Sequence, residues 1–358
     1  MTLAVNLAQG ASNNVTFRNR IINGGMVLDQ RNAGASVTPT NGQYLLDRWA
    51  ADVSQASKFT VIQSSTAPAG FSNSLLVTSS SAYTVGTNDY FALHQFVEGF
   101  NIADFSFGSA SATYITLSFW VRSSLTGTFG VGLRGASNTR SYTATYTIST
   151  ANTFEYKTIT IPGDTSGTWL TTNGVGIGLF FSLGVGSANS TTAGSWQSVN
   201  ATSPTGAGSV VGTNGATFYI TGVQLEAGTT ASPFEYRQYG TELGLCQRYF
   251  QRNTSDNSDY PFSSVYAYTT SVSAGYLPLA VPMRTTPTAA IVTNMALNGY
   301  GLGSQTLSSL GTIYSSNGIG SGITIFCNPT TTTSSLTANQ VYALVNRGGG
   351  GYTLSAEL

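Results

Sequence analysis

The chain has 358 residues, enough for two domains of ordinary size. Only 8% of the residues are charged, whereas 41% are hydrophobic and 11% aromatic, a combination that favours packed β-structure over a disordered tail. Fourteen basic residues balance fourteen acidic ones without a basic run, so nucleic acid is not an expected partner. No apolar run approaches the ~20 residues of a membrane helix, so membrane insertion is not expected either.

The charges are unevenly distributed. No charged residue lies between Asp164 and Glu226, and none lies between Arg284 and Arg347. One interpretation is a β-surface that is hydrated by Ser, Thr and Asn alone. The other is that these stretches face identical copies in a homo-oligomer, where charge burial is unfavourable. We favour the second, because a monomer with a net charge near zero has little colloidal protection.

The N-terminal two-thirds of the chain reads as β-strands. Residues 1–17 are expected to form a short arm. In 113–122, Ile115, Leu117, Phe119 and Val121 share one face, which predicts a strand with one buried side. Similar alternation is found at 142–148, 159–161 and 175–181. In 218–225 the phase changes, and a bulge at Gly222 would place Phe218, Ile220, Val223 and Leu225 on one side. Many short strands between Gly, Asn and Ser turns indicate a β-sandwich.

Helical periodicity occurs only at 241–252, where Thr241 is the expected N-cap of a short helical connector. Beyond it, strand-like pieces at 264–270, 275–281, 290–292, 322–327 and 341–345 predict a small second β-domain over 253–358. The prolines after Tyr276 indicate that the piece at 275–281 is an edge or connecting segment. Gly- and Ser-rich stretches over 299–322 and a Thr-rich one over 330–337 are expected loops. The glycines of 348–351 read as a flexible tail.

Five short motifs occur in an order that resembles a known family. They are Ile21-Ile22-Asn23-Gly24, Asp47-Arg48-Trp49, Gln95-Phe96-Val97-Glu98-Gly99, Thr116–Arg122 around Ser118-Phe119-Trp120, and Val223–Phe250 with Glu226, Glu235 and Arg237. This order resembles the carbohydrate-binding-module-like jelly roll of bacteriophage tail-fibre and other virion surface proteins. The resemblance implies an all-β fold, with an antiparallel jelly-roll sandwich over 18–240. It also implies a homotrimer when the protein is part of a fibre.

The resemblance also assigns structural roles. Asp47, Arg48, Trp49, Glu98, Trp120, Glu226, Glu235 and Arg237 would be fold-signature residues that act as ion pairs, core and turn anchors. Jelly rolls of this kind often hold a structural calcium through acidic residues after the first Asn-Gly and before the last strand. Here Gly25 and Thr221-Gly222 occupy those positions, so no metal and no cofactor is expected.

No catalytic group stands out. His94, the single histidine, lies on an expected strand and is interpreted as a core or rim residue with a partner. No nucleophile-elbow pattern accompanies it, and no compact acidic motif suggests paired carboxylates for glycan hydrolysis. We therefore expect no enzyme. Trp169 and Trp196, in polar, Gly-rich surroundings, are the candidate glycan-stacking residues, with a structural plug at the sandwich end as the alternative.

These observations lead to three hypotheses. The first is a phage virion protein, a fibre or spike subunit on the virion surface, assembled in the host cytoplasm and contributing to attachment to host glycans. The second is a head-fibre or capsid-decoration protein that contacts other virion proteins. The third, less favoured, is a polysaccharide depolymerase.

Overall fold

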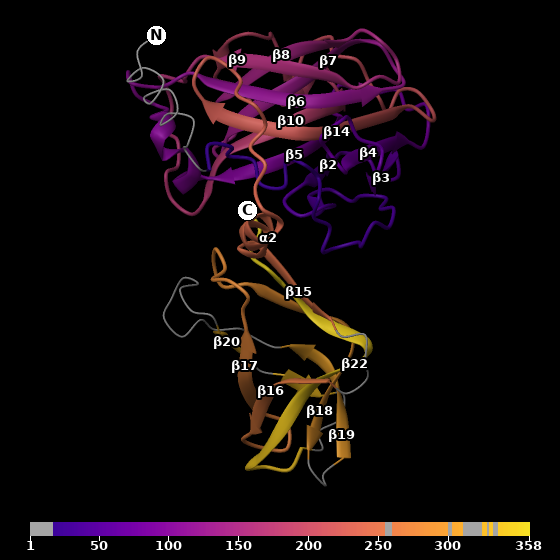
Figure 1. Cartoon of the computed structure of the whole chain (residues 1–358), viewed down its shortest axis with the longest axis vertical. Helices are drawn as coiled ribbons and strands as arrows, with labels where there is room; N and C mark the ends of the chain where they lie inside the picture. Colours follow the sequence, from indigo (N-terminus) through magenta and orange to yellow (C-terminus); the bar gives the residue numbers. More distant parts are fainter. Residues whose placement is uncertain (1–16, 255–259, 300–302, 311–323, 328, 332–335) are drawn as a thin grey trace. The chain divides into compact units, whose positions relative to one another are not determined.

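The computed structural model describes residues 17–254, 260–299, 303–310, 324–327, 329–331 and 336–358 (Figure 1). The chain divides into two compact units: unit 1 ends at Arg237, and unit 2 spans Gln238–Glu357. Most of the expected arm, residues 1–16, lies outside the described residues. None of the helices in the described ranges is long and apolar enough to cross a membrane.

Unit 1 is an antiparallel jelly-roll sandwich of two sheets. The larger sheet has the order β1-β2-β5-β10-β7-β8-β12, and the smaller has the order β3-β4-β14-β6-β9. The strands of the larger sheet are β1 (Gln43–Tyr44), β2 (Ala50–Val53), β5 (Tyr90–Glu98), β7 (Gly127–Gly135), β8 (Ser141–Ile148), β10 (Val175–Val185) and β12 (Trp196–Gln197). Those of the smaller sheet are β3 (Phe59–Ser64), β4 (Ser74–Ser79), β6 (Ile115–Ser123), β9 (Glu155–Ile161) and β14 (Thr217–Ala227).

Short elements connect these strands. They are the 3-10 helices η1 (Gly99–Phe105) and η2 (Ser187–Asn189), and the parallel pair β11 (Ser190–Thr191) and β13 (Ser203–Pro204). The pair β11 and β13 belongs to a covering segment, residues 187–209, that joins β10 to the last strand of unit 1.

The core lies between the two sheets, as the sequence alternation predicted. Ile115, Leu117, Phe119 and Val121 of β6 are each 0% exposed, whereas Trp120 on the opposite face is partly exposed. The predicted bulge in β14 is confirmed: the register with β6 shifts between Thr221 and Gln224, so that all four apolar residues become fully buried. Gly222 has φ +61°, a left-handed conformation that a side chain disfavours.

The Asp47-Arg48-Trp49 motif forms a buried turn before β2. The Asp47 carboxylate accepts hydrogen bonds from the backbone and side-chain amides of Gln30, both at 2.7 Å. The Arg48 guanidinium donates to the carbonyl of Phe96, and the Trp49 indole donates to the carbonyl of Asn23 at 3.1 Å. All three side chains are 0–1% exposed, and Glu98 at the end of β5 is 1% exposed. This turn therefore ties the first segment of unit 1 to the larger sheet.

A second polar cluster closes unit 1. The carboxylate of Glu235 accepts hydrogen bonds from the backbone N–H groups of Phe17, Arg18 and Asn19. The guanidinium of Arg237 donates to the carbonyls of Asn19 and Ile21 and pairs with Glu235 at 3.2 Å. The end of the sandwich is thus joined to its beginning by charged hydrogen bonds.

Glu226 belongs to the same end of the sandwich. Its carboxylate accepts hydrogen bonds from the amide and hydroxyl of Ser232 and from the side chain of Gln224. It therefore anchors the turn that follows β14.

Unit 2 is a second β-structure built on one sheet. Its order is β20-β17-β16-β22-β18-β19-β21, with β15 paired to β22. Its elements are α2 (Tyr239–Gln247), β15 (Phe250–Thr254), β16 (Tyr260–Ala267), β17 (Ser273–Pro278), β18 (Thr288–Gly299), β19 (Gly303–Leu310), β20 (Thr324–Cys327), β21 (Pro329–Thr331) and β22 (Gln340–Ser355). Val265, Leu277, Leu297, Tyr342 and Leu344 are central to its hydrophobic core.

Several local expectations for unit 2 were wrong. The helix spans 239–247 with Gln238 as its N-cap, instead of 241–252 with Thr241, because residues 250–254 pair with β22 as β15. The glycines of 348–351 lie inside the 16-residue strand β22 and are not a tail. β17 pairs with both β16 and β20, so it is not an edge, and β19 occupies part of a predicted loop.

Candidate functional site

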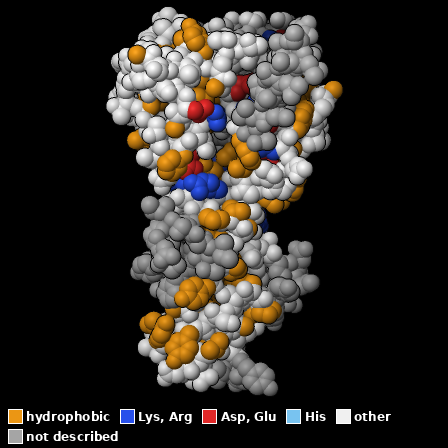
Figure 2. All heavy atoms as spheres, turned by 60° about the vertical axis from the view of Figure 1, so that its left-hand side comes forward, with side chains coloured by type: hydrophobic (Ala, Val, Ile, Leu, Met, Phe, Trp, Pro, Cys, Tyr) orange, Lys and Arg blue, Asp and Glu red, His pale blue; other side chains and the backbone are white. Residues whose placement is uncertain are grey.

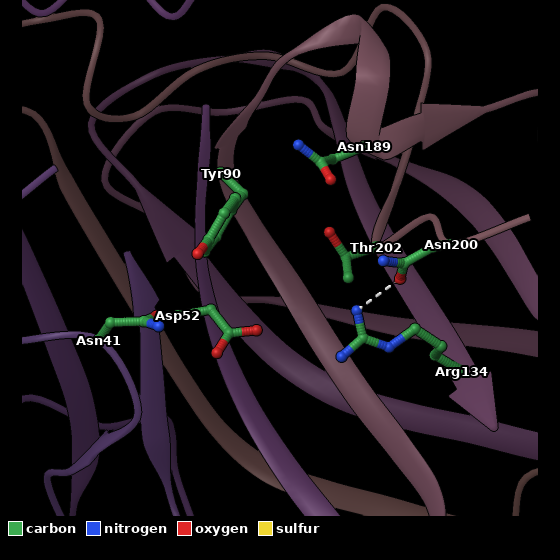
Figure 3. Close-up of a pocket in the computed structure, with 7 residues that line it drawn as sticks. All are labelled: Asn41, Asp52, Tyr90, Arg134, Asn189, Asn200 and Thr202. Atoms are coloured by element: carbon green, nitrogen blue, oxygen red, sulfur yellow. Dashed lines mark hydrogen bonds between the residues drawn. The ribbon is translucent and has the colours of Figure 1, made fainter. Parts of the chain in front are cut away.

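A polar pocket lies on the outer face of the larger sheet of unit 1 (Figure 3). It has a volume of about 240 Å³. Its lining comes from five places in the chain: Asn41 beside β1, Asp52 of β2, Tyr90 of β5, Arg134 of β7, and Asn189, Asn200 and Thr202 of the covering segment. The sandwich thus brings together residues that are up to 161 positions apart in the sequence.

The strand registers explain why these side chains meet. In β2, β5 and β10, every second residue enters the core, so Asp52, His94 and Phe180 lie on the outer face. Across the strands His94 is opposite both Ala50 and Phe180. The guanidinium of Arg134 lies 4.5 Å from the centre of the Phe180 ring. The Phe180 ring below the pocket therefore helps to hold the arginine in place.

The covering segment forms one wall of the pocket. Arg134 donates a hydrogen bond of 2.8 Å to the side-chain oxygen of Asn200. A Cβ added at Gly132 would lie 2.5 Å from the carbonyl oxygen of Thr202, so the segment rests directly on β7. Glycine at this position of β7 allows that close approach. The backbone spacing between β7 and the segment therefore sets the position of Asn200 and Thr202.

The pocket carries a negative side chain on one side and a positive side chain on the other. Figure 3 shows the Asp52 carboxylate and the Arg134 guanidinium facing each other across the pocket. Burial lowers the pKa of the Arg134 guanidinium, and the nearby Asp52 carboxylate opposes that shift. The pocket thus offers an acceptor on one side and a donor fork on the other.

The histidine lies beneath this pocket. His94 is 3% exposed, and its Nδ1 atom is 3.4 Å from an Asp52 carboxylate oxygen. Burial lowers the pKa of His94; Asp52 raises it, and Arg134 and Arg48 lower it further. At neutral pH the ring is therefore neutral. The burial matches the predicted core or rim histidine, but the expected partner is present only as the nearby Asp52 carboxylate, because Nδ1 makes no hydrogen bond to any residue that the structure describes.

The lining suits a ligand with many hydroxyl groups. Tyr90 contributes a partly exposed aromatic ring. The Asp52 carboxylate accepts hydrogen bonds, the Arg134 guanidinium donates them, and the three asparagine amides do both. A few polar groups around one aromatic ring can form hydrogen bonds to a polar, ring-shaped molecule.

The two tryptophans predicted as stacking residues lie together elsewhere in unit 1. Trp169 and Trp196 meet edge to face with ring centres 5.3 Å apart, and Phe107 contacts both. Trp169 is only 8% exposed, and its indole donates to the carbonyl of Ser166. Trp196 is partly exposed, packs on Tyr142 and donates to the carbonyl of Pro162. The geometry of Trp169 favours the alternative, a structural plug.

Sequence reasoning missed the pocket residues. Asp52 is one of the dispersed carboxylates that form no compact acidic motif in the sequence. Asn41, Asn189 and Asn200 lie in connecting segments that resemble any other polar loop of this chain. The one local signal of a pocket was the pair Tyr90 and His94, two ring residues four positions apart that point outward from the same strand. The residues that surround them come from distant parts of the sequence.

In the described part of the chain, no group of three or more His, Cys, Asp or Glu side chains could hold a metal ion. At the end of the sandwich formed by the first segment and the turn after β14, the Arg237 guanidinium donates to the carbonyls of Asn19 and Ile21. A fixed positive charge therefore contacts oxygens at this end of the fold.

Comparisons with known proteins gave structural likenesses only. No family model matches the chain, and a search of curated proteins found no significant match. Among solved structures, the enzymatically active domain of tailspike protein 4 from bacteriophage CBA120 is 13% identical, with a TM-score of 0.32; the match covers 60% of this chain and 22% of that one.

Carbohydrate-binding modules are also among the similar solved structures. The family 11 module of a Clostridium thermocellum cellulase is 14% identical over 55% of this chain and 98% of its own, with a TM-score of 0.27. TmCBM61 in complex with β-1,4-galactotriose is 11% identical over 59% and 99%, with a TM-score of 0.29. All three TM-scores lie below 0.5, so the jelly-roll assignment rests on the strand order and registers of this chain.

Proposed function

We propose that unit 1 binds a glycan in the pocket formed by Tyr90, Asp52, Arg134 and the three asparagines. The observation that carries the proposal is the convergence of one tyrosine ring with donors and acceptors of both charges in a hollow of about 240 Å³. This volume is below the ~300–1,000 Å³ of pockets for drug-sized ligands, which favours one sugar unit or a chain end.

We propose binding without cleavage. Hydrolysis of a glycosidic bond generally uses two carboxyl groups on either side of the bond. Among the described pocket residues, Asp52 is the one carboxylate. The neighbouring His94 is buried beneath the pocket and would have to reach a substrate past Asp52.

The biological setting that we propose is a phage fibre or spike subunit that contributes to attachment on the host surface. Its support is the ordered motif set from Ile21 to Phe250, which resembles virion surface proteins. Several weak pockets on one oligomer would gain avidity through a high effective concentration. A small pocket of about 240 Å³ is suited to such multivalent binding.

The test begins with a glycan array probed with the full chain, displayed multivalently. A glycan that binds is then titrated against the wild type and against Tyr90→Ala. Loss of one ring contact is worth about 0.5–1.5 kcal/mol, so the Kd should rise roughly 2- to 12-fold. Tyr90→Phe should bind almost as well as the wild type, because the stacking ring remains.

Tyr114 supplies the matched control, because it is a tyrosine of unit 1 that is 50% exposed and does not line the pocket. Tyr114→Ala should leave the Kd unchanged. An array without binding at high multivalency would refute the adhesive role and favour the head-fibre or decoration hypothesis. Release of reducing sugar from host polysaccharide would instead support a depolymerase.

A further inference from the structure

Unit 2 presents an apolar surface where an antiparallel sheet would ordinarily be polar. The surface consists of Tyr266 (38% exposed), Tyr268 (53%), Tyr276 (55%), Val272 (51%) and Val341 (60%), which we call the tyrosine face. Figure 2 shows hydrophobic side chains gathered on the surface of unit 2. Contiguous exposed apolar side chains of this kind mark interaction sites.

Strand pairing places these side chains together. Tyr266 of β16 is opposite Val341 of β22, and the rings of Tyr266 and Tyr268 meet with centres 5.0 Å apart. Val272 lies in the turn after β16 and accepts a backbone hydrogen bond from Tyr268. The alternate residues Val265 and Ala267 enter the core, so the outward face is set by strand periodicity.

The face is neutral as well as apolar. Residues 260–346 contain a single charged residue, Arg284. Ser264, Thr269, Thr270 and Ser271 around the tyrosine face are exposed and uncharged. An apolar, Tyr-rich centre depleted of charge within a polar rim is the composition of a protein–protein interface. A basic or acidic partner would find no opposite charge on it.

We propose that the tyrosine face binds the tyrosine face of another copy of this chain. A neutral Tyr and Val surface is complementary to itself, as contacts between identical patches require. A flat glycan fits less well, because the Tyr266 and Tyr268 rings are inclined by 77° and form no common plane. The two valines offer a sugar neither a ring nor a hydrogen bond, but they pack well against a second protein surface.

The experiment measures the mass of the full chain by sedimentation equilibrium, with Val341→Lys as the test variant. Val341 is 60% exposed, so the isolated subunit should tolerate lysine. In the interface, the lysine ammonium group would be removed from water without gaining a charged or hydrogen-bonding partner, which is energetically unfavourable. The wild-type chain, of 37.4 kDa, should form dimers or larger oligomers at micromolar concentration. The dissociation constant of these oligomers should be at least about tenfold higher for the variant.

Leu170→Lys is the control, because Leu170 is an exposed apolar residue of unit 1 at 41% and lies outside the face. Circular dichroism checks that each variant keeps its β-structure. A wild-type monomer at about 100 µM, or equal association of both variants, would overturn the proposal. Glycan binding that is lost in Val341→Lys while the chain remains monomeric would also overturn it and assign the face to a sugar.

Discussion

Arg237 gives the sharpest test of how unit 1 is closed. Its guanidinium donates to the carbonyls of Asn19 and Ile21 and pairs with Glu235, with side chains 7% and 13% exposed. Replacement by methionine keeps an unbranched apolar stem but removes the charge and the donors. Two carbonyls then lose their partners, and the carboxylate of Glu235 remains partly buried without its cation.

The magnitude follows from these contacts. An unsatisfied buried acceptor costs about 1–3 kcal/mol, and removal of one partner of a buried ion pair costs about 3–5 kcal/mol in total. We therefore expect Arg237→Met to lower the free energy of unfolding of unit 1 by about 3–5 kcal/mol. At roughly 2–4 °C per kcal/mol for a unit of this size, the Tm should fall by about 6–20 °C.

Tryptophan fluorescence isolates the transition of unit 1, because all four tryptophans of the chain lie before Gln238. Arg20→Met is the matched control: Arg20 pairs with Asp104, which is 54% exposed, and such a pair is worth about 0–1 kcal/mol. If Arg237→Met cost no more than Arg20→Met, the closing cluster would not stabilise the sandwich, and the reasoning would be refuted.

Two further predictions concern the pocket. Gly132→Ala should push Thr202 away from β7 and raise the Kd for the glycan about fivefold or more in titration calorimetry. Gly25→Ala is the control, because its new Cβ would meet its nearest atom at 3.8 Å, and its Kd should be unchanged. Equal Kd values for both variants would contradict the role of the covering segment as a wall of the pocket. Because the pKa of His94 is lowered in the folded chain, the unfolded chain binds the histidine proton more tightly. The free energy of unfolding should therefore be highest above the ordinary pKa of 6.5 and should decrease as the pH falls from 6.5 toward the pKa of the folded chain. NMR titration of this single histidine checks the sign, and a midpoint above 6.5 would contradict it.

The parts of the fold that sequence could predict are those governed by local periodicity. The alternation in β6 and the phase change at Gly222 each reflect which side of a strand meets the core, so both were readable from neighbouring residues. The second half of β22 was not, because the glycines of 348–351 carry no alternating pattern. Gly348 and Gly349 have φ values of +38° and +76° within the strand, and Gly351 pairs with both β15 and β18.

The candidate site depended on distant contacts and was missed for that reason. Trp169 looked exposed among Gly, Ser and Thr, yet Phe107 and Trp196 pack on it. Asn200 looked like an ordinary loop residue, yet the covering segment places it against Arg134. Local sequence does not encode which loop crosses which sheet face, so the pocket required the structure.

We propose that a glycan occupies the pocket on the outer face of the larger sheet. The most direct measurement is a crystal structure of the full chain with the glycan selected on the array. We expect a sugar ring against Tyr90, with its hydroxyl groups between Asp52 and Arg134. A sugar bound on Trp196, or anywhere else with this pocket empty, would contradict it.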